Sequence, residues 1–370
     1  MKILHLVTSI DSGGVSTFLY NYYKNMDRSN FKFEIAAIDR NHRQVFHDPF
    51  EALGARIHYM PKDYIKRLLY ISKLIYYGNY NIVHSHIELP SAIYLLIAKI
   101  FGVKARIAHA HMAFLDYSSI KNKIMQRLLN KVSTHRWGCS PDAVIGLFGN
   151  KYGQEATIVY NAIDIKKYSF NENRRNEYRR NMLLDDKYVV GFIGRLTHQK
   201  NIFYLLKIFD ELQKIKGDAI LLVVGTGEQE QQFISKIKEL KLESKILLLG
   251  VRDDVNHLMK AMDVLLLPSR WEGLGIVLIE AQAAALKCIA SNKVPQSTNV
   301  SPYILYRSIE DDPKSWANTV KKHCDGYSRQ SIDEIIASNH YDITQEAFYL
   351  SEKYINVMKM INYSKSKANE

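Results

Sequence analysis

Short apolar runs alternate with amphipathic stretches along almost the whole chain. The apolar runs have the length of buried strands, and the stretches between them carry apolar residues at the spacing of one helix face. This alternation is typical of parallel sheets with helical crossovers, so the predicted fold class is α/β. Strands of a first sheet are predicted at Lys2–Thr8, Phe31–Ile38, Arg56–Met60, Ile82–His86, Lys104–His111 and Thr134–Cys139. A second series is predicted at Tyr188–Ile193, Ala219–Val224, Lys245–Leu249, Asp263–Leu267 and Lys287–Ala290, with helices such as Phe203–Ile215, Glu230–Leu240 and Val255–Met262 between them.

The two series of strands predict two domains. A polar, arginine-rich run over residues 171–180 separates them, and 370 residues suffice for two domains that each bury a core. The predicted boundaries are 1–165 for the first domain and 166–343 for the second. Residues 344–370 are predicted to form a C-terminal helix and a polar tail, because apolar residues from Ala347 to Ile361 share one helical face.

Two glutamates enclose a glycine-rich turn after one strand of the second series. Glu272 and Glu280 lie in the stretch PSRWEGLGIVLIEAQAAA, in which Gly273, Leu274 and Gly275 precede an apolar helical run. If both glutamates belonged to one helix, about 12 Å would separate them along its axis, too far to share one small group. We therefore expect Glu272 in the loop and Glu280 early in the helix, whose free N–H groups are suited to an anion.

Other candidate residues also follow predicted strands, where ligands bind in open α/β sheets. Gly13 and Gly14 follow the first strand of the chain, within a Ser-Gly-Gly-Val loop that opens a helix. In the second series the residues that follow strands are Gly194, Arg195 and Lys200 in GRLTHQKN, Gly225 and Thr226 in GTGE, and Arg252 in GVRD. None of these loops is a dinucleotide-binding or Walker motif, which argues against NAD and ATP sites.

These motifs resemble those of a known enzyme family. The E-x7-E segment, GRLTHQKN and RIAHAH together resemble the family-four retaining glycosyltransferases, and more narrowly the bacterial enzymes of capsular and exopolysaccharide synthesis. The resemblance covers nearly the whole chain. It implies the GT-B fold, in which two Rossmann-like domains face each other across a cleft and a C-terminal helix crosses back to the first. It also implies that the first domain binds the acceptor and the second the nucleotide-sugar.

The resemblance assigns roles to the candidate residues. Glu272 would contact the donor sugar, the amides of Gly273 to Gly275 the phosphates, and Glu280 the ribose. Arg195 and Lys200 would stabilise the negative charge that develops on the departing diphosphate. The resemblance places Gly194, Gly225 and Thr226 near the donor, Arg252 near the base and His111 near the donor sugar.

His111 is preferred to His109 within the stretch HAH. Alternation along a strand directs both side chains to the same side of the sheet, but only the later residue passes the strand end. A histidine in a strand is more often packed than functional, and for His84 and His86 both readings remain open.

The net charge of +12 is concentrated in the first domain. Residues 1–165 hold 20 basic and 12 acidic side chains, a surplus of 8. No nucleic-acid-binding motif accompanies them, so an anionic membrane surface is preferred to nucleic acid as a partner. The basic, tyrosine-rich stretch Tyr64–Tyr77 is suited to a headgroup layer, and a second basic stretch spans Lys121–Arg136. The alternative is that both are core-facing helices with solvated lysines.

The sequence indicates no resident cofactor or metal. No D-x-D follows a predicted strand, and the three cysteines stand far apart, which argues against a zinc site and for a reducing compartment. We predict a metal-independent, retaining hexosyl- or N-acetylhexosaminyltransferase in the cytoplasm, with docking on the inner membrane face as a hypothesis. It would transfer a sugar from a UDP-sugar to a hydroxyl of a saccharide, and a lipid-linked acceptor is expected. The alternatives are a GT-B sugar-nucleotide epimerase or hydrolase, and a non-catalytic basic membrane-binding protein.

Overall fold

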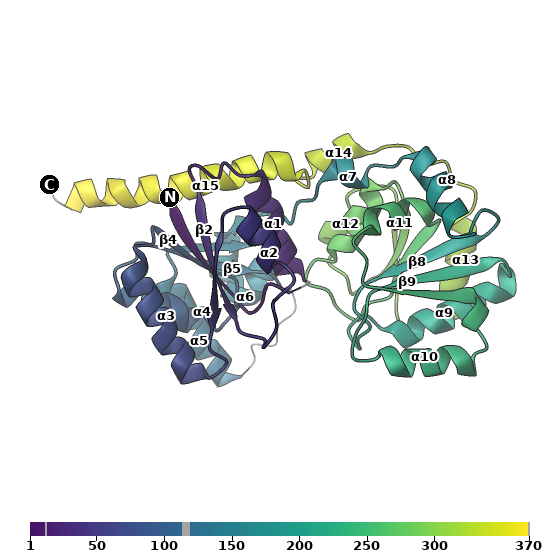
Figure 1. The fold of residues 1–370 in the computed structure, drawn as a ribbon, viewed down its shortest axis with the longest axis horizontal. Coiled ribbons are helices and arrows are strands. Elements are labelled where there is room, and N and C mark those ends of the chain that lie inside the picture. Colours follow the sequence, from purple (N-terminus) through teal and green to yellow (C-terminus); the bar gives the residue numbers. More distant parts are fainter. Residues whose placement is uncertain (12, 113–118, 369–370) are drawn as a thin grey trace. The chain divides into compact units, whose positions relative to one another are not determined.

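The computed structural model describes residues 1–11, 13–112 and 119–368, with side chains up to Ile361 (Figure 1). The chain forms two compact units. The first comprises Met1–Ile163 together with the segment from Asp342 onward, and the second comprises Asp164–Tyr341. The roles predicted for the two domains remain predictions.

The first unit contains a seven-stranded sheet in the order β3-β2-β1-β4-β5-β6-β7, and all its strand pairs are parallel. Its central strands are buried almost throughout, as expected for parallel strands covered on both faces, although polar side chains stand among their apolar residues. The strands are β1 (Lys2–Val7), β2 (Lys32–Ile38), β3 (Arg56–Met60), β4 (Ile82–Ser85), β5 (Ala105–Ala110), β6 (His135–Gly138) and β7 (Thr157–Ile158). The helices are α1 (Gly14–Asn25), α2 (His47–Ala52), α3 (Tyr64–Gly78), α4 (Ser91–Ile100), α5 (Ile120–Val132) and α6 (Pro141–Gln154).

The second unit contains a six-stranded parallel sheet in the order β10-β9-β8-β11-β12-β13. The strands are β8 (Tyr188–Ile193), β9 (Ala219–Val224), β10 (Ile246–Gly250), β11 (Val264–Leu267), β12 (Lys287–Ser291) and β13 (Ile304–Arg307). The helices are α7 (Ile165–Tyr168), α8 (Glu172–Asn181), α9 (Ile202–Ile215), α10 (Glu230–Glu239), α11 (Val255–Ala261), α12 (Ile276–Ala283), α13 (Pro313–Cys324) and α14 (Asp333–Ser338). The predicted α/β class with two parallel sheets is confirmed.

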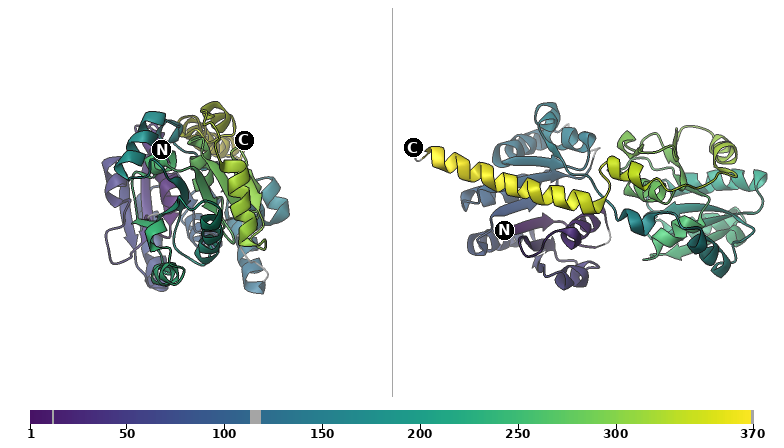
Figure 2. Two further views of the ribbon diagram at one scale, coloured as in Figure 1. Left: turned by 90° about the vertical axis from the view of Figure 1, so that its right-hand side faces the viewer. Right: turned by 90° about the horizontal axis from the view of Figure 1, so that it is seen from above.

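Helix α15 (Ile343–Ala368) belongs to the first unit and packs against α1 and β5. Figure 2 shows it as one long helix along that unit. Ala347, Leu350 and Tyr354 are buried in the same apolar cluster as Phe18 of α1. The predicted return of the C-terminal helix to the first domain is therefore confirmed.

Helix ends follow the polar residues that flank the apolar runs. Asp63 accepts a hydrogen bond from the Lys66 amide at the start of α3, and Ser140 caps α6 in the same way just before Pro141. Among the helices that the structure describes, none is both long and apolar enough to cross a membrane.

Candidate functional site

Four loops meet at the carboxyl edge of the second sheet, where backbone hydrogen bonds connect them. The Gly225 amide donates to the Gly250 carbonyl at 2.7 Å, which joins the loop after β9 to the end of β10. The Gly194 amide donates to the Val224 carbonyl at 2.9 Å, and the Leu196 amide to the Thr226 carbonyl at 3.0 Å. The Arg270 amide donates to the Gln199 carbonyl at 2.8 Å, which links the loop after β11 to the loop after β8. The loops predicted to bind the donor are therefore neighbours within one unit.

Gly225 permits the closest of these approaches. Its φ of +123° is rarely adopted by residues with a side chain, and a Cβ there would lie 2.2 Å from the Gly194 carbonyl oxygen. Only glycine fits this position, so the glycine of the GTGE motif brings the loop after β9 onto the loop after β8.

Lys200 and Glu272 form an ion pair that the sequence did not predict. Lys200 Nζ lies 2.6 Å from Glu272 Oε1, and the two side chains are 15% and 7% exposed. The Ser269 hydroxyl donates to the same carboxylate oxygen at 2.5 Å. A largely buried carboxylate requires such partners. Lys200, which is predicted to bind the phosphates, therefore neutralises Glu272, which is predicted to bind the sugar.

Three more predicted residues of these loops have exposed side chains. Arg195 and Thr226 are exposed at the ends of β8 and β9. Arg252 is exposed after β10 and pairs with Asp254 through two hydrogen bonds of 2.8 and 2.6 Å. A ligand that used the Arg252 guanidinium would compete with that carboxylate.

The loop–helix junction after β11 matches the expected placement of the two glutamates. Gly275, at φ +83°, ends the loop, and α12 begins at Ile276. Leu274 is buried beneath the loop and Gly273 is partly exposed. Glu272 thus lies in the loop and Glu280 in the second turn of the helix.

Glu280 is held by a tyrosine from a distant part of the chain. The Tyr168 hydroxyl, at the end of α7, donates to Glu280 Oε1 at 2.8 Å. Burial raises the pKa of Glu280 to about 7, against the lowering effect of that hydrogen bond. The carboxyl group is therefore poised between its charged and neutral forms near neutral pH.

The candidate residues of the first unit lie at the ends of β1 and β5. Gly14 opens α1 and Gly13 is its extended N-cap residue, and a Cβ on either would meet no atom within 4 Å. Ser12 of the same loop lies outside the described residues. His111 follows the last residue of β5, and its amide donates to Glu88 Oε1 at 2.8 Å. Burial raises the pKa of Glu88 to about 7.

His111 belongs to a cluster of five histidines on one face of the first sheet. The other members are His5, His84, His86 and His109, and all four are buried. Their ring nitrogens are hydrogen-bonded in chains, so His86 packs within this cluster instead of standing alone at a strand end. His5 was missed, because one histidine in an apolar strand carries no signal of its own.

Three groups of described side chains have the spacing of a metal site. They are His5 with His84 and His86, His86 with His109 and His111, and the more exposed His47 with Asp48 and Glu51. In the two buried groups, hydrogen bonds between imidazoles already occupy part of the nitrogens.

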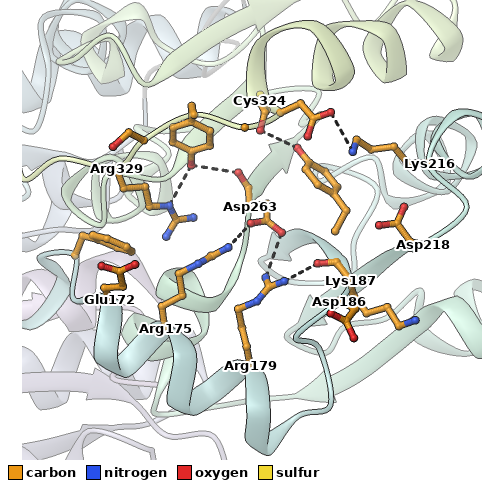
Figure 3. A pocket seen from close by; sticks show the side chains of 16 residues that line it. Glu172, Arg175, Arg179, Asp186, Lys187, Lys216, Asp218, Asp263, Cys324 and Arg329 are labelled. Atoms are coloured by element: carbon orange, nitrogen blue, oxygen red, sulfur yellow. Dashed lines mark hydrogen bonds and ion pairs between the residues drawn. The ribbon is translucent and has the colours of Figure 1, made fainter.

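A cavity of about 540 Å³ in the second unit lies at the opposite, amino edge of the sheet (Figure 3). Asp263, just before β11, pairs with Arg175 at 2.5 Å and with Arg179 at 3.2 Å. These arginines also donate to carbonyls near the end of α11, and so does Arg329. The arginines are therefore structural, and none of the predicted site residues lines this cavity.

Comparisons with known proteins agree with this geometry. Residues 173–322, all in the second unit, match the family described as glycosyl transferases group 1. Putative glycosyltransferase EpsF of Bacillus subtilis is 26% identical over 95% of this chain and 96% of its own length. The second unit therefore contains a group 1 glycosyltransferase domain. The capsular polysaccharide biosynthesis glycosyltransferase CapH of Staphylococcus aureus is also 26% identical, over 96% of this chain and 99% of its own.

A solved structure shares the fold of this chain. Anabaena Alr3699/HepE in complex with UDP has a TM-score of 0.79 at 18% identity, over 96% of this chain and 100% of that chain. The predicted GT-B fold is thereby confirmed. The roles of the individual site residues remain predictions.

Proposed function

We propose that this glycosyltransferase transfers a sugar from a UDP-sugar to a saccharide hydroxyl, with retention of the anomeric configuration. The proposal of UDP is supported by the shared fold with HepE, which was solved with UDP. A role in surface polysaccharide synthesis is supported by the similarity to CapH, a capsular polysaccharide enzyme.

The Lys200–Glu272 ion pair is the observation on which the proposed site rests. A largely buried pair of opposite charges costs desolvation energy, and a donor with a phosphate and a hydroxylated sugar offers a new partner to each member. In this proposal the Lys200 ammonium leaves Glu272 and binds the diphosphate, which Arg195 also contacts. Glu272 then accepts hydrogen bonds from sugar hydroxyls. Glu280 binds the ribose, and the amides of Leu274 and Gly275 face a phosphate.

The proposed chemistry needs charge stabilisation more than a protein nucleophile. The bond from the anomeric carbon to the phosphate oxygen breaks, and the acceptor oxygen bonds to that carbon on the same face. The acceptor's hydroxyl proton passes to the departing phosphate oxygen. Arg195 and Lys200 stabilise the charge of this leaving group more strongly in the transition state than before it.

Titration with nucleoside diphosphates tests the donor assignment. We expect UDP to bind the full chain, and we expect Arg195→Ala and Glu280→Gln to weaken binding by roughly tenfold or more, since the first removes a charged contact to the phosphates and the second alters the carboxyl group that would accept from the ribose. Arg180→Ala, an exposed arginine on α8, is the matched control. Failure of UDP to bind would refute the proposal.

Product analysis tests the reaction. Mass spectrometry with UDP-sugars and lipid-linked saccharides, in excess EDTA, is expected to show an acceptor with one added sugar. Free sugar or an epimerised donor without such a product would indicate the epimerase or hydrolase instead.

For the acceptor side, we propose that α3, α4 and α5 of the first unit dock on an anionic membrane. Part of the basic stretch Tyr64–Tyr77 is core, because Ile71 and Ile75 are buried. Exposed apolar side chains nevertheless gather at the ends of α3 and α4, which pack against each other: Tyr77 is 77% and Ile100 is 69% exposed. The basic residues beside them are exposed too, at Lys73, Lys99 and Lys104.

Sedimentation with anionic vesicles tests this docking. Each large apolar side chain that enters the headgroup layer contributes about 1–2 kcal/mol. Tyr77→Ser/Ile100→Ser is therefore expected to weaken vesicle binding at low salt by at least tenfold. Val251→Ser, which changes an equally exposed residue of the second unit, is the control. If the wild-type chain does not sediment with the vesicles, the docking proposal is wrong.

A further inference from the structure

A second cavity of the second unit is lined mainly by basic side chains. It has a volume of about 510 Å³ and lies where α7 and α8 pack against α11. Its cations are Lys166 and Lys167 on α7, Arg174 on α8 and Lys260 on α11, and Asp333 is the one acidic residue among the described residues that line it. Four cations against one carboxylate leave a surplus of three positive charges.

Lys260 brings one of these charges into the protein interior. The residue is 4% exposed, and its ammonium donates to the Lys167 carbonyl at 3.0 Å. It forms no ion pair with any residue that the structure describes. An ammonium group has three N–H donors, and a buried charge is normally paired with an opposite charge. Lys260 therefore has donors left for an anion in the cavity that it lines.

The groups around Lys260 do not supply the missing negative charge. The Lys260 carbonyl, in the last turn of α11, accepts hydrogen bonds from Arg175 at 3.0 Å and from Arg329 at 2.9 Å. The carbonyl end of this helix is thus already bound by two guanidinium groups. Burial and the neighbouring charge of Arg174 lower the pKa of Lys260, as expected for an ammonium that lies near another cation.

The other cations lie at the rim of the cavity. Lys166 and Lys167 are exposed, and the Lys166 side chain has no hydrogen bond or ion pair with any described residue. Arg174 pairs with Glu177 through Nη1 at 2.7 Å. With Glu177 counted, the cavity still keeps a surplus of two positive charges, which suits an anion that carries more than one charge.

The uncharged lining residues suit a hydroxylated ring. Ser169 and Asn171 carry hydrogen-bonding groups, and Phe170 between them carries an aromatic ring. His257 adds a neutral imidazole, because burial and two neighbouring cations lower its pKa. The volume falls within the range of sites for small organic molecules.

We propose that this cavity binds a phosphorylated sugar, whose phosphate lies between Lys166, Lys167 and Lys260 and whose hydroxyls face Ser169 and Asn171. A phosphate monoester carries roughly two negative charges near neutral pH, which matches the surplus, whereas a single carboxylate would leave a positive charge without a partner. All of these residues lie in the second unit. None of them belongs to the proposed donor site, so the inference does not rest on the proposed function.

Calorimetric titration of the full chain with glucose 1-phosphate at low ionic strength tests the site. We expect a dissociation constant below about 1 mM and no comparable binding of glucose, which lacks the phosphate. Lys260→Met removes the buried ammonium and should weaken binding by about tenfold or more, since hydrogen bonds between charged groups are the strong ones.

An exposed position keeps the test independent of folding. Lys166→Glu reverses a charge at the rim of the cavity and should weaken the binding of glucose 1-phosphate by at least about threefold. Lys238→Glu makes the same change of net charge at an exposed lysine of α10 that does not line the cavity. This control should bind glucose 1-phosphate as the wild type does.

Two ligands distinguish this site from the proposed donor site. Arg195→Ala should weaken the binding of UDP but not that of glucose 1-phosphate, and Lys166→Glu should do the reverse. The inference is overturned if glucose 1-phosphate does not bind the wild type, if glucose binds equally well, if Lys166→Glu binds glucose 1-phosphate no more weakly than Lys238→Glu, or if Arg195→Ala abolishes that binding. Failure of UDP alone to bind would overturn the proposed function and leave this site intact.

Discussion

Replacement of Lys200 by methionine tests the energetics of the candidate site. The methionine keeps most of the length and apolar volume of the lysine stem but removes the ammonium group. Glu272, only 7% exposed, then keeps the Ser269 hydroxyl but loses its 2.6 Å ion pair. Removing one partner of a buried ion pair costs about 3–5 kcal/mol, because the remaining charge is left without a counter-ion. We expect a loss near the lower end, since Ser269 still donates.

A double-mutant cycle isolates the pair. Glu272→Gln alone should destabilise the second unit for the converse reason, because it leaves the Lys200 ammonium largely buried. When Lys200→Met and Glu272→Gln are combined, neither charge remains, so the double variant should lose less than the sum of the two single losses. The expected coupling energy is about 2 kcal/mol, within the range for residues in direct contact.

Native-state hydrogen exchange read by mass spectrometry is the appropriate assay. It reports the opening free energy of the amides of each unit separately, so a change in the first unit does not obscure the result. If the two single losses add in the double variant to within about 0.5 kcal/mol, the two side chains are not coupled and the reasoning fails.

Three further predictions concern other parts of the second unit. For Glu280, burial raises the pKa in the folded state above the ordinary value of 4.5 to about 7, so the fold favours the neutral carboxyl group. The stability that this neutral group contributes to the folded protein is lost as the pH rises from about 4.5 to 7. The free energy of unfolding of Glu280→Gln, measured with urea, should therefore rise relative to that of the wild type by up to about 3 kcal/mol across that interval. A difference between the two proteins that stays constant with pH would contradict this. Asp263→Asn leaves two largely buried arginines without their carboxylate, so it should lower the free energy of unfolding by about 3 kcal/mol while UDP affinity is retained. Asp185→Asn, an exposed control, should lower it little. Equal losses for the two variants in unfolding experiments would refute the structural role of Asp263. Gly225→Ala places a Cβ 2.2 Å from a carbonyl oxygen and should abolish UDP binding. Gly250→Ala, at φ +61° with open space around it, should lower the free energy of unfolding by about 1–2 kcal/mol. If calorimetric titration finds that both variants bind UDP equally well, the loop contact is not needed.

The fold could be predicted because short segments of the sequence are enough to identify most of its strands and helices. Each central strand is a short apolar run with glycine or polar residues at its end, and parallel sheets bury such runs on both faces. The elements that were missed lack this signal. Strand β7 has two residues, and β13 is a partly exposed edge strand in which only Ile304 is buried.

The position of the site could also be predicted, because the carboxyl ends of parallel strands meet at one edge. Its contacts could not. Lys200 is 72 residues from Glu272, and Tyr168 is 112 residues from Glu280. Nothing in a local pattern specifies which lysine reaches which carboxylate, because that choice depends on how the loops after neighbouring strands pack.

The same pairing changes how kinetic data on this site must be interpreted. Lys200 and Glu272 neutralise each other, so removal of either residue should destabilise the enzyme itself. A fall in activity of a Lys200 variant therefore combines a folding loss with a loss of leaving-group stabilisation. The double-mutant cycle separates the two, because the stability losses should be less than additive in the double variant, whereas transfer should stay low in all three variants. Arg195 is exposed and forms no such buried pair, so its substitution should report on diphosphate binding and leaving-group stabilisation without a folding loss.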